Sequence, residues 1–414
     1  VLAYEINGSF LSSVEANPEK LGDEKKFKLN ALFLGGNARQ LHKQGKVEYT
    51  PGYLRDAAVG IHNRDPEYKY DIVAVRVSPP DENGYHSLGP NHDMIMTLIE
   101  RQPNVKIIAE INPNVPRTRG TNKIKGHRFF ASYHSDSQLA GPVVVPYTPV
   151  EKAIGEYVAE LIPNDANLQI GIGNLFNGLP DAIKAKGTQR IKMYSEMISD
   201  SAMNMVENGN VERIKTGFAF GSTDFYKWLD GNQKVEFAST LEVNDIAKIS
   251  KKNRMHAVNT ALQVNLKGDV NATMGPNNAR ISSPGGQAEF MQGAKLSKQG
   301  KSIIAIRSTA KMGEISTIAL NLYGDSITTP HENVSHVVTE YGIAVLKNKS
   351  ERERALALIK ISHPKFRKEL AEDAYLSDII TEQDLTTIRY NDKEIPLEIV
   401  DEAIEEAAEE APKA

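Results

Sequence analysis

Two apolar segments separated by a helical one constrain the fold of this chain most strongly. Residues 71–77 (DIVAVRV) form a valine-rich run that is typical of a strand buried in a parallel sheet. A turn-rich loop and an amphipathic segment over 93–100 follow, and residues 105–110 (VKIIAE) form the next apolar run. Parallel strands are joined by crossover helices of this kind. The spacing therefore predicts a βαβ unit and an α/β fold with a mainly parallel sheet.

The same alternation continues through the rest of the chain. A proline-rich extended stretch at 141–149 marks an expected boundary between an α/β domain over 1–145 and a second one over 146–414. Further strands are expected at 1–5, 30–34, 165–172, 191–194, 235–238, 255–266, 302–307, 316–320 and 336–339. Further helices are expected at 38–44, 150–161, from 181, 200–208, 350–361 and 364–374, with an acidic last helix or tail over 401–410.

The composition excludes several classes of function. The 414 residues include no cysteine, which excludes disulfides, thiolate nucleophiles and cysteine-based metal sites and fits a reducing cytoplasm. A net charge of −4, without a basic face interleaved with aromatics, gives no support to nucleic-acid binding. No apolar run approaches the roughly 20 residues that a membrane span needs. We therefore expect a soluble, cytoplasmic enzyme that binds neither nucleic acid nor membrane.

One glutamate near the end of an expected strand is the first candidate for catalysis. In the stretch 235–245 (VEFASTLEVND), Glu242 lies between two apolar residues and before an Asn-Asp turn. The later glycine loop Ser283-Pro284-Gly285-Gly286 is expected to face it. A carboxylate presented to free backbone amides can act as a nucleophile whose acyl product those amides stabilise. Taken alone, the glutamate is more often an ordinary solvated acid at the end of a strand.

Other motifs fail on particular residues. The loop after residue 170 has Gly171 and Gly173 in the spacing of a dinucleotide-binding loop, and Glu196 follows at the next strand as a ribose-binding acid would, but Phe176 replaces the third glycine. A P-loop would need Lys and Ser/Thr where this chain has Leu179 and Pro180. The sequence has no HExxH helix for zinc and no GxSxG elbow.

A series of longer motifs identifies the family that the chain resembles. They are VSPPDENGYHSLG (77–89), IAEINPNVPRTRG (108–120), IGIGN (170–174), MYSEMISD (193–200), LEVND (241–245), NTALQVNLKGDVN (259–271), SPGGQAEF (283–290), VVTEYGIAVLKNKSERERALALI (337–359) and HPKFRKEL (363–370). Together they resemble the acetyl-CoA hydrolase/CoA-transferase family, in particular the branch of 4-hydroxybutyrate, butyrate and acetate CoA-transferases. The resemblance covers nearly the whole chain, in order.

The resemblance implies two related open α/β domains with the active site between them, and a homo-oligomer. It implies ping-pong acyl transfer without a metal or a permanently bound cofactor, with acyl-CoA and small carboxylic acids as substrates. Glu242 would form a mixed anhydride and then a thioester with CoA. The Gly285–Gly286 loop would supply amides to the oxyanion and a wall against CoA, and Asn259 a further side-chain donor.

Cations and hydroxyls after the expected strand 302–307 are candidates to hold the CoA phosphates. They are Arg307, Ser308, Thr309 and Lys311, with Lys295 and Lys298 as weaker candidates. Phe176, Phe218 and Phe220 indicate a pocket for a short aliphatic acid rather than a dicarboxylate.

The chain departs from the usual pattern of the family in two places. Relatives usually have a further stretch before the strand at Val1, and many have a shorter loop than GIGNLFNGLPDAI (171–183).

Two alternative functions remain open. An acyl-CoA hydrolase would use the same scaffold and differ in water access at Glu242. A non-catalytic CoA-binding protein would not need to retain Glu242, Asn259 and the glycine loop together.

Overall fold

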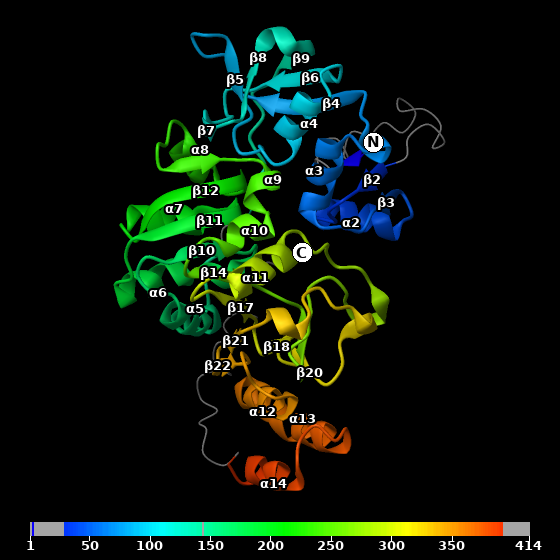
Figure 1. Cartoon of the computed structure of the whole chain (residues 1–414), viewed down its shortest axis with the longest axis vertical. Helices are drawn as coiled ribbons and strands as arrows, with labels where there is room; N and C mark the ends of the chain where they lie inside the picture. The colour runs from blue at the N-terminus through cyan, green and yellow to red at the C-terminus, as the bar shows by residue number, and fades with distance from the viewer. Residues whose placement is uncertain (1, 4–28, 143–144, 392–414) are drawn as a thin grey trace.

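The computed structural model describes residues 2–3, 29–142 and 145–391 (Figure 1). The expected tail over 401–410 and most of the expected strand 1–5 lie outside these residues. Within them, the molecule is built on one large parallel sheet with smaller sheets from the N-terminal part of the chain (blue to cyan in Figure 1).

The large sheet has nine strands in the order β22-β21-β17-β14-β10-β11-β12-β13-β7. Neighbouring strands are parallel except β21 and β22, which are antiparallel. Their bounds are β7 Arg119–Gly120, β10 Asn167–Ile170, β11 Ile191–Ile198, β12 Val211–Ala219, β13 Val235–Phe237, β14 Met255–Asn259, β17 Lys301–Ala305, β21 His336–Thr339 and β22 Gly342–Val345. The predicted parallel α/β architecture is confirmed.

Helices cover both faces of this sheet because its strands are apolar on both faces. Along β17, Ile303 belongs to the core under α5, α6, α7 and α8, whereas Ile304 belongs to the core on the other face, under α10, α11, α12 and α13. This alternation is the period of two of a β-strand. The helices are α5 Pro149–Leu161, α6 Leu179–Lys186, α7 Asp200–Glu207, α8 Thr223–Leu229, α10 Ile246–Ser250, α11 Gln287–Leu296, α12 Glu351–Ile361, α13 Pro364–Leu376 and α14 Glu382–Asn391.

The predicted βαβ unit is present in the N-terminal part. Strand β4 (Ile72–Val77) leads through α4 (Ile95–Arg101) to the parallel strand β6 (Lys106–Ile111), and β9 (Phe129–His134) completes this sheet. The expectation that residues 71–77 are buried throughout is wrong. Val75 and Val77 are buried, but Ile72 is 55% exposed, because β4 is an edge strand with one face on the core.

Short elements complete the described part of the chain. They are β1 Leu2–Ala3, β2 Leu29–Ala31, α2 Gly36–Lys43, β3 Val47–Tyr49, α3 Leu54–Asn63, β5 Tyr85–Ser87, β8 Lys123–Lys125, α9 Thr240–Val243, β15 Gln263–Asn265, β16 Val270–Asn271, β18 Thr309–Ala310, β19 Ile315–Ser316 and β20 Ile318–Ala319, with single 3₁₀ turns at Pro66–Tyr68, Gly126–Arg128, Asn174–Phe176, Pro276–Asn278, Tyr323–Asp325 and His331–Asn333. The expected strands 255–266 and 316–320 are each divided in two.

The N-terminal part supplies one edge of the large sheet. Strand β7 pairs in parallel with β13, with Arg119 opposite Glu236 and Gly120 opposite Phe237. Gly120 has a φ of +135°, and a Cβ there would overlap the Phe237 carbonyl. Glycine is therefore required where the two parts of the chain meet.

We predict that Gly120→Ala destabilises the protein by about 2 kcal/mol, because the side chain would clash with the β13 backbone in a strained conformation. The measurement is the free energy of unfolding in urea. Gly187→Ala is the matched control, since Gly187 also has a positive φ (+75°) but no atom within 4 Å of its Cβ position. It should cost only about 1 kcal/mol, and equal losses in the two variants would contradict the proposed clash.

Candidate active site

Glu242 lies on a short helix directly after a strand of the large sheet. Strand β13 ends at Phe237, and the Ser239 hydroxyl then accepts a hydrogen bond from the Leu241 N–H at 3.2 Å, which starts helix α9. The predicted strand is thus confirmed up to Phe237, but Glu242 lies in a helix after the strand rather than at the strand end itself. The N-cap serine converts this stretch into a helical turn.

The Glu242 carboxylate is paired with one lysine and remains partly open to solvent. Lys215 of β12 contacts its Oε1 at 2.8 Å and also contacts Glu236 at 2.8 Å. The Glu242 side chain is 39% exposed. Its backbone carbonyl accepts a hydrogen bond from the Tyr194 hydroxyl at 2.7 Å, which fixes the helix against β11.

Neighbouring lysines keep Glu242 ionised. Partial burial raises the pKa of its carboxyl, but the hydrogen bond and charge of Lys215, with the charges of Lys248 and Lys252, outweigh burial and hold the pKa below its usual range. A carboxyl with a lowered pKa is a carboxylate at neutral pH, which is the nucleophilic form.

The glycine loop is held between the N-terminal part and a group of buried acids. The Ser283 hydroxyl accepts the Leu34 N–H at 3.1 Å, and the Gly285 carbonyl accepts the Leu54 N–H at 3.4 Å. A Cβ on Gly286 would overlap the Glu196 carboxyl and the Asn244 amide. Close packing against these two side chains therefore requires glycine at 286, a reason that the sequence did not reveal.

The acids behind the loop were not predicted as part of the site. The side-chain amide of Asn244 donates to Glu196 at 2.6 Å and to Glu289 at 3.0 Å, and all three residues are buried. Burial raises the pKa of Glu196 to about 7 and that of Glu289 to about 8. Burial and the nearby Glu196 raise the pKa of Asp93 to about 8. The sequence signals were Glu196 beside apolar residues in the strand IKMYSEMI and Asn244 two residues after Glu242.

Asn259 lies at the end of β14, beside the first glycine loop. Its amide exchanges two hydrogen bonds of 3.0 Å with the amide of Gln169 on β10. A Cβ on Gly171 would lie 2.8 Å from the Asn259 oxygen, so this loop also needs glycine to pack against the asparagine.

Two of the predicted phosphate-binding residues already have acidic partners. Arg307 forms an ion pair with Glu151 of α5, and Ser308 donates through its N–H and hydroxyl to Glu340 at 2.9 and 2.5 Å. Thr309 lies in β18, and Lys311 is exposed in the turn that follows.

The aromatic residues expected near an acyl group are not equivalent. Phe176 is only 2% exposed and belongs to the core between the sheet and its helices, so it lines no open pocket. Phe218 and Phe220 are half-buried at the end of β12. Of the three, these two remain compatible with a pocket.

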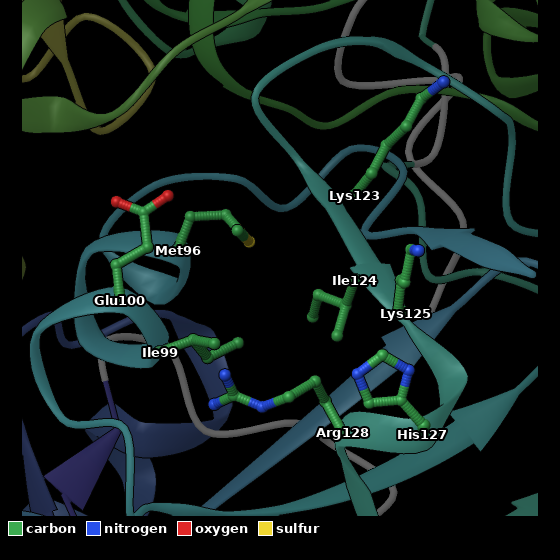
Figure 2. Close-up of a pocket in the computed structure, with 8 residues that line it drawn as sticks. All are labelled: Met96, Ile99, Glu100, Lys123, Ile124, Lys125, His127 and Arg128. Carbon is green, nitrogen blue, oxygen red and sulfur yellow. The ribbon is translucent and has the colours of Figure 1, made fainter.

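A pocket of about 280 Å³ lies elsewhere, between α4 and β8 (Figure 2). Its lining is apolar at Met96, Ile99 and Ile124 and charged or polar around them, at Glu100, Lys123, Lys125, His127 and Arg128. It contains none of the predicted site residues. Within the described ranges, no group of His, Asp and Glu side chains could hold a metal ion, and no helix is long and apolar enough to cross a membrane.

Comparisons with known proteins address the family. The model of the acetyl-CoA hydrolase/transferase N-terminal domain matches residues 4–135, and that of the C-terminal domain matches residues 221–374. The chain is 38% identical over 367 residues to 4-hydroxybutyrate coenzyme A transferase of Clostridium kluyveri, covering 86% of this chain and 83% of that protein. It is 31% identical over 372 residues to butyryl-CoA:acetate CoA-transferase of Anaerostipes caccae, covering 85% and 82%.

Solved structures of related fold support the same family assignment. RipA from Yersinia pestis superimposes with a TM-score of 0.84 at 27% identity, over 92% of this chain and 87% of that one. The resemblance in the motifs, the two domain models and the fold lead to one conclusion. The chain belongs to the acetyl-CoA hydrolase/CoA-transferase family of enzymes.

Proposed function

We propose that this enzyme moves CoA between an acyl-CoA and a short-chain carboxylate through a thioester between CoA and Glu242. The observation that carries this proposal is the state of Glu242, which is ionised, partly exposed and held by Lys215 on a helix whose backbone is fixed. The relatives named as CoA-transferases support the reaction class.

The reaction needs one nucleophile used twice. A Glu242 oxygen attacks the acyl carbonyl, the C–S bond breaks, and CoA leaves as a thiolate while a mixed anhydride forms. The thiolate then attacks the glutamyl carbonyl and releases the first acid as a carboxylate. A second carboxylate attacks the resulting glutamyl thioester, and the two steps run in reverse to give the new acyl-CoA. Neither half-reaction consumes a proton.

The groups around Glu242 would stabilise the negative charges that are present before and during the reaction. Lys215 keeps the carboxylate ionised before attack, and Glu236 keeps the lysine in place afterwards, when Glu242 is an uncharged anhydride or thioester. The amides of Gly285 and Gly286 and the side chain of Asn259 are proposed donors to the oxyanions, at about 2.7–4 kcal/mol each.

We further propose that Arg307, Ser308, Thr309 and Lys311 bind the phosphates of CoA. We also propose that the enzyme is a cytoplasmic homo-oligomer without a permanently bound cofactor.

Hydrolysis is the second candidate function. The 39% exposure of the Glu242 side chain would let water reach the anhydride or thioester as well as a carboxylate. The two reactions differ in whether CoA is released without an acceptor acid.

We predict that Glu242→Gln lowers transferase activity by at least about 1,000-fold, because the amide cannot form the anhydride. Mass spectrometry after incubation with butyryl-CoA alone should show a CoA adduct on the peptide containing Glu242, discharged by added acetate. Glu236→Gln is the control, since it contacts the same lysine, and it should retain the adduct. An adduct elsewhere, or none, would refute the mechanism, and continuous release of CoA without acetate would indicate hydrolysis.

We predict that Lys215→Met raises the pKa of Glu242, because the variant removes both the hydrogen bond and the nearest charge. Titration of ¹³C-carboxyl-labelled glutamate by NMR would measure it. Lys248→Met removes a charge without a hydrogen bond and should shift the pKa less. The assigned role of Lys215 fails if the two variants titrate alike.

We predict faster transfer to acetate or butyrate than to succinate, because the half-buried Phe218 and Phe220 favour an apolar acyl group over a second carboxylate. The measurement is kcat/KM for each acid with one acyl-CoA donor. Equal or better rates with succinate would overturn this assignment.

A further inference from the structure

Glu196 and Glu289 form a carboxyl pair on the side of the glycine loop away from solvent. Glu196 comes from β11 and Glu289 from the first turn of α11, and the amide of Asn244 bridges them with bonds of 2.6 and 3.0 Å. Their exposed fractions are 9% and 5%, and Asn244 is fully buried. Two carboxylates that share one neutral donor in a buried site repel each other, so the arrangement favours retention of protons.

The other charged groups that face the pair strengthen this tendency. Asp56 of α3 adds negative charge near Glu289, and Asp93, which precedes α4, is a further buried carboxyl near Glu196. Arg55 of α3 acts on Glu289 from a distance, but its guanidinium is bound to Asp245 at 2.6 Å. An oxygen of Asp93 is itself buried without a hydrogen-bond partner among the described residues, as suits a neutral acid.

The pair also holds the loop that the proposed reaction uses. The Gly286 backbone amide faces the Glu196 carboxyl and opposes the rise of its pKa, and Gly286 lies so close that a side chain there would overlap Glu196 and Asn244. Asn244 ends the helix that carries Glu242. The pair therefore connects the nucleophile's helix with the loop expected to stabilise the oxyanion.

We propose that Glu196 and Glu289 retain protons at neutral pH and act as positioning residues that hold the Gly285–Gly286 loop in register with Glu242. A neutral carboxyl is a weaker acceptor than a carboxylate, so protonation of Glu196 leaves the Gly286 N–H more available to an oxyanion. If both acids were ionised, Glu196 would compete more strongly with an oxyanion for the Gly286 N–H, and the two carboxylates would repel each other across Asn244. The effect on catalysis rests on the proposed function, whereas the protonation itself does not.

The sign of the pH effect follows from the direction of the shifts. Glu196 and Glu289 bind protons more tightly in the folded protein, with pKa values raised to about 7 and 8, than in the unfolded chain. Their contribution to stability is therefore complete below the ordinary glutamate pKa and is lost as the pH rises through these values. The same rise should inactivate the enzyme on the alkaline side.

We predict that Glu289→Gln, which is permanently neutral, flattens the fall of Tm between pH 5 and 9. It should also make the alkaline limb of the kcat profile less steep, because only Glu196 of the pair is left to ionise. Glu369→Gln, at an exposed position of α13, is the matched control and should leave both profiles unchanged. The proposal is overturned if Glu289→Gln has the same Tm slope and the same alkaline limb as the control.

Infrared spectroscopy of the Asp93→Asn variant, which lacks the other buried neutral acid, decides the same question if Glu289→Gln fails to fold. A carbonyl band of buried, protonated carboxylic acid should be present at pH 6 and lost by pH 9, and its absence at pH 6 overturns the proposal.

The adduct on Glu242 separates this inference from the proposed function. If the adduct forms but Glu289→Gln leaves the pH profiles of Tm and kcat unchanged, the role of the acid pair is refuted and the glutamyl thioester stands. If Glu289→Gln flattens these profiles but no adduct forms, the glutamyl thioester is refuted and the role of the acid pair stands.

Discussion

The position of helix α9 is the constraint on which the rest of the site depends. A four-residue helix is too short to be stable by itself, so contacts from other elements must hold it. These contacts are the Tyr194 hydroxyl on the Glu242 carbonyl, the Thr97 hydroxyl on Ser239 at 2.9 Å, the Asn244 bridge to Glu196 and Glu289, and the ion pair of Arg55 with Asp245. They come from both the N-terminal part and the large sheet. The direction of the Glu242 side chain is thus fixed by tertiary structure rather than by its own helix.

The parallel sheet explains why the candidate residues gather at one edge. Asn259 ends β14, Arg307 follows β17 and Glu242 follows β13. All parallel strands present their carboxyl ends at the same edge, where ligands bind in open α/β sheets. The first glycine loop after β10 lies at this edge as well. The sheet therefore accounts for the location of the candidate site, and α9 and the Gly285–Gly286 loop account for its geometry.

The sequence predicted those parts of the molecule whose signals are local. The βαβ unit at 71–110 and most strands of the large sheet follow from runs of apolar residues, and the motifs identified the family. Helix α9 could not be predicted from periodicity, because four residues give no helical period and the Ser239 cap reads equally as a turn. The pairing of β7 with β13 joins residues more than a hundred positions apart and left no local signal. The acid pair was missed for the same reason, since Glu196 and Glu289 meet only when β11 and α11 pack together.

The buried acids are costly to folding, and that cost indicates what the site requires. An apolar pair at 196 and 289 would fill the space without a pH-dependent loss of stability. It would also leave the amide of Asn244 without acceptors, which is unfavourable for a buried donor, and would remove the group that the Gly286 N–H faces in the resting enzyme. A neutral carboxyl satisfies these donors while remaining a weak enough acceptor to release one of them. A loop proposed to bind an oxyanion only transiently needs such a partner, which neither a carboxylate nor an apolar side chain provides.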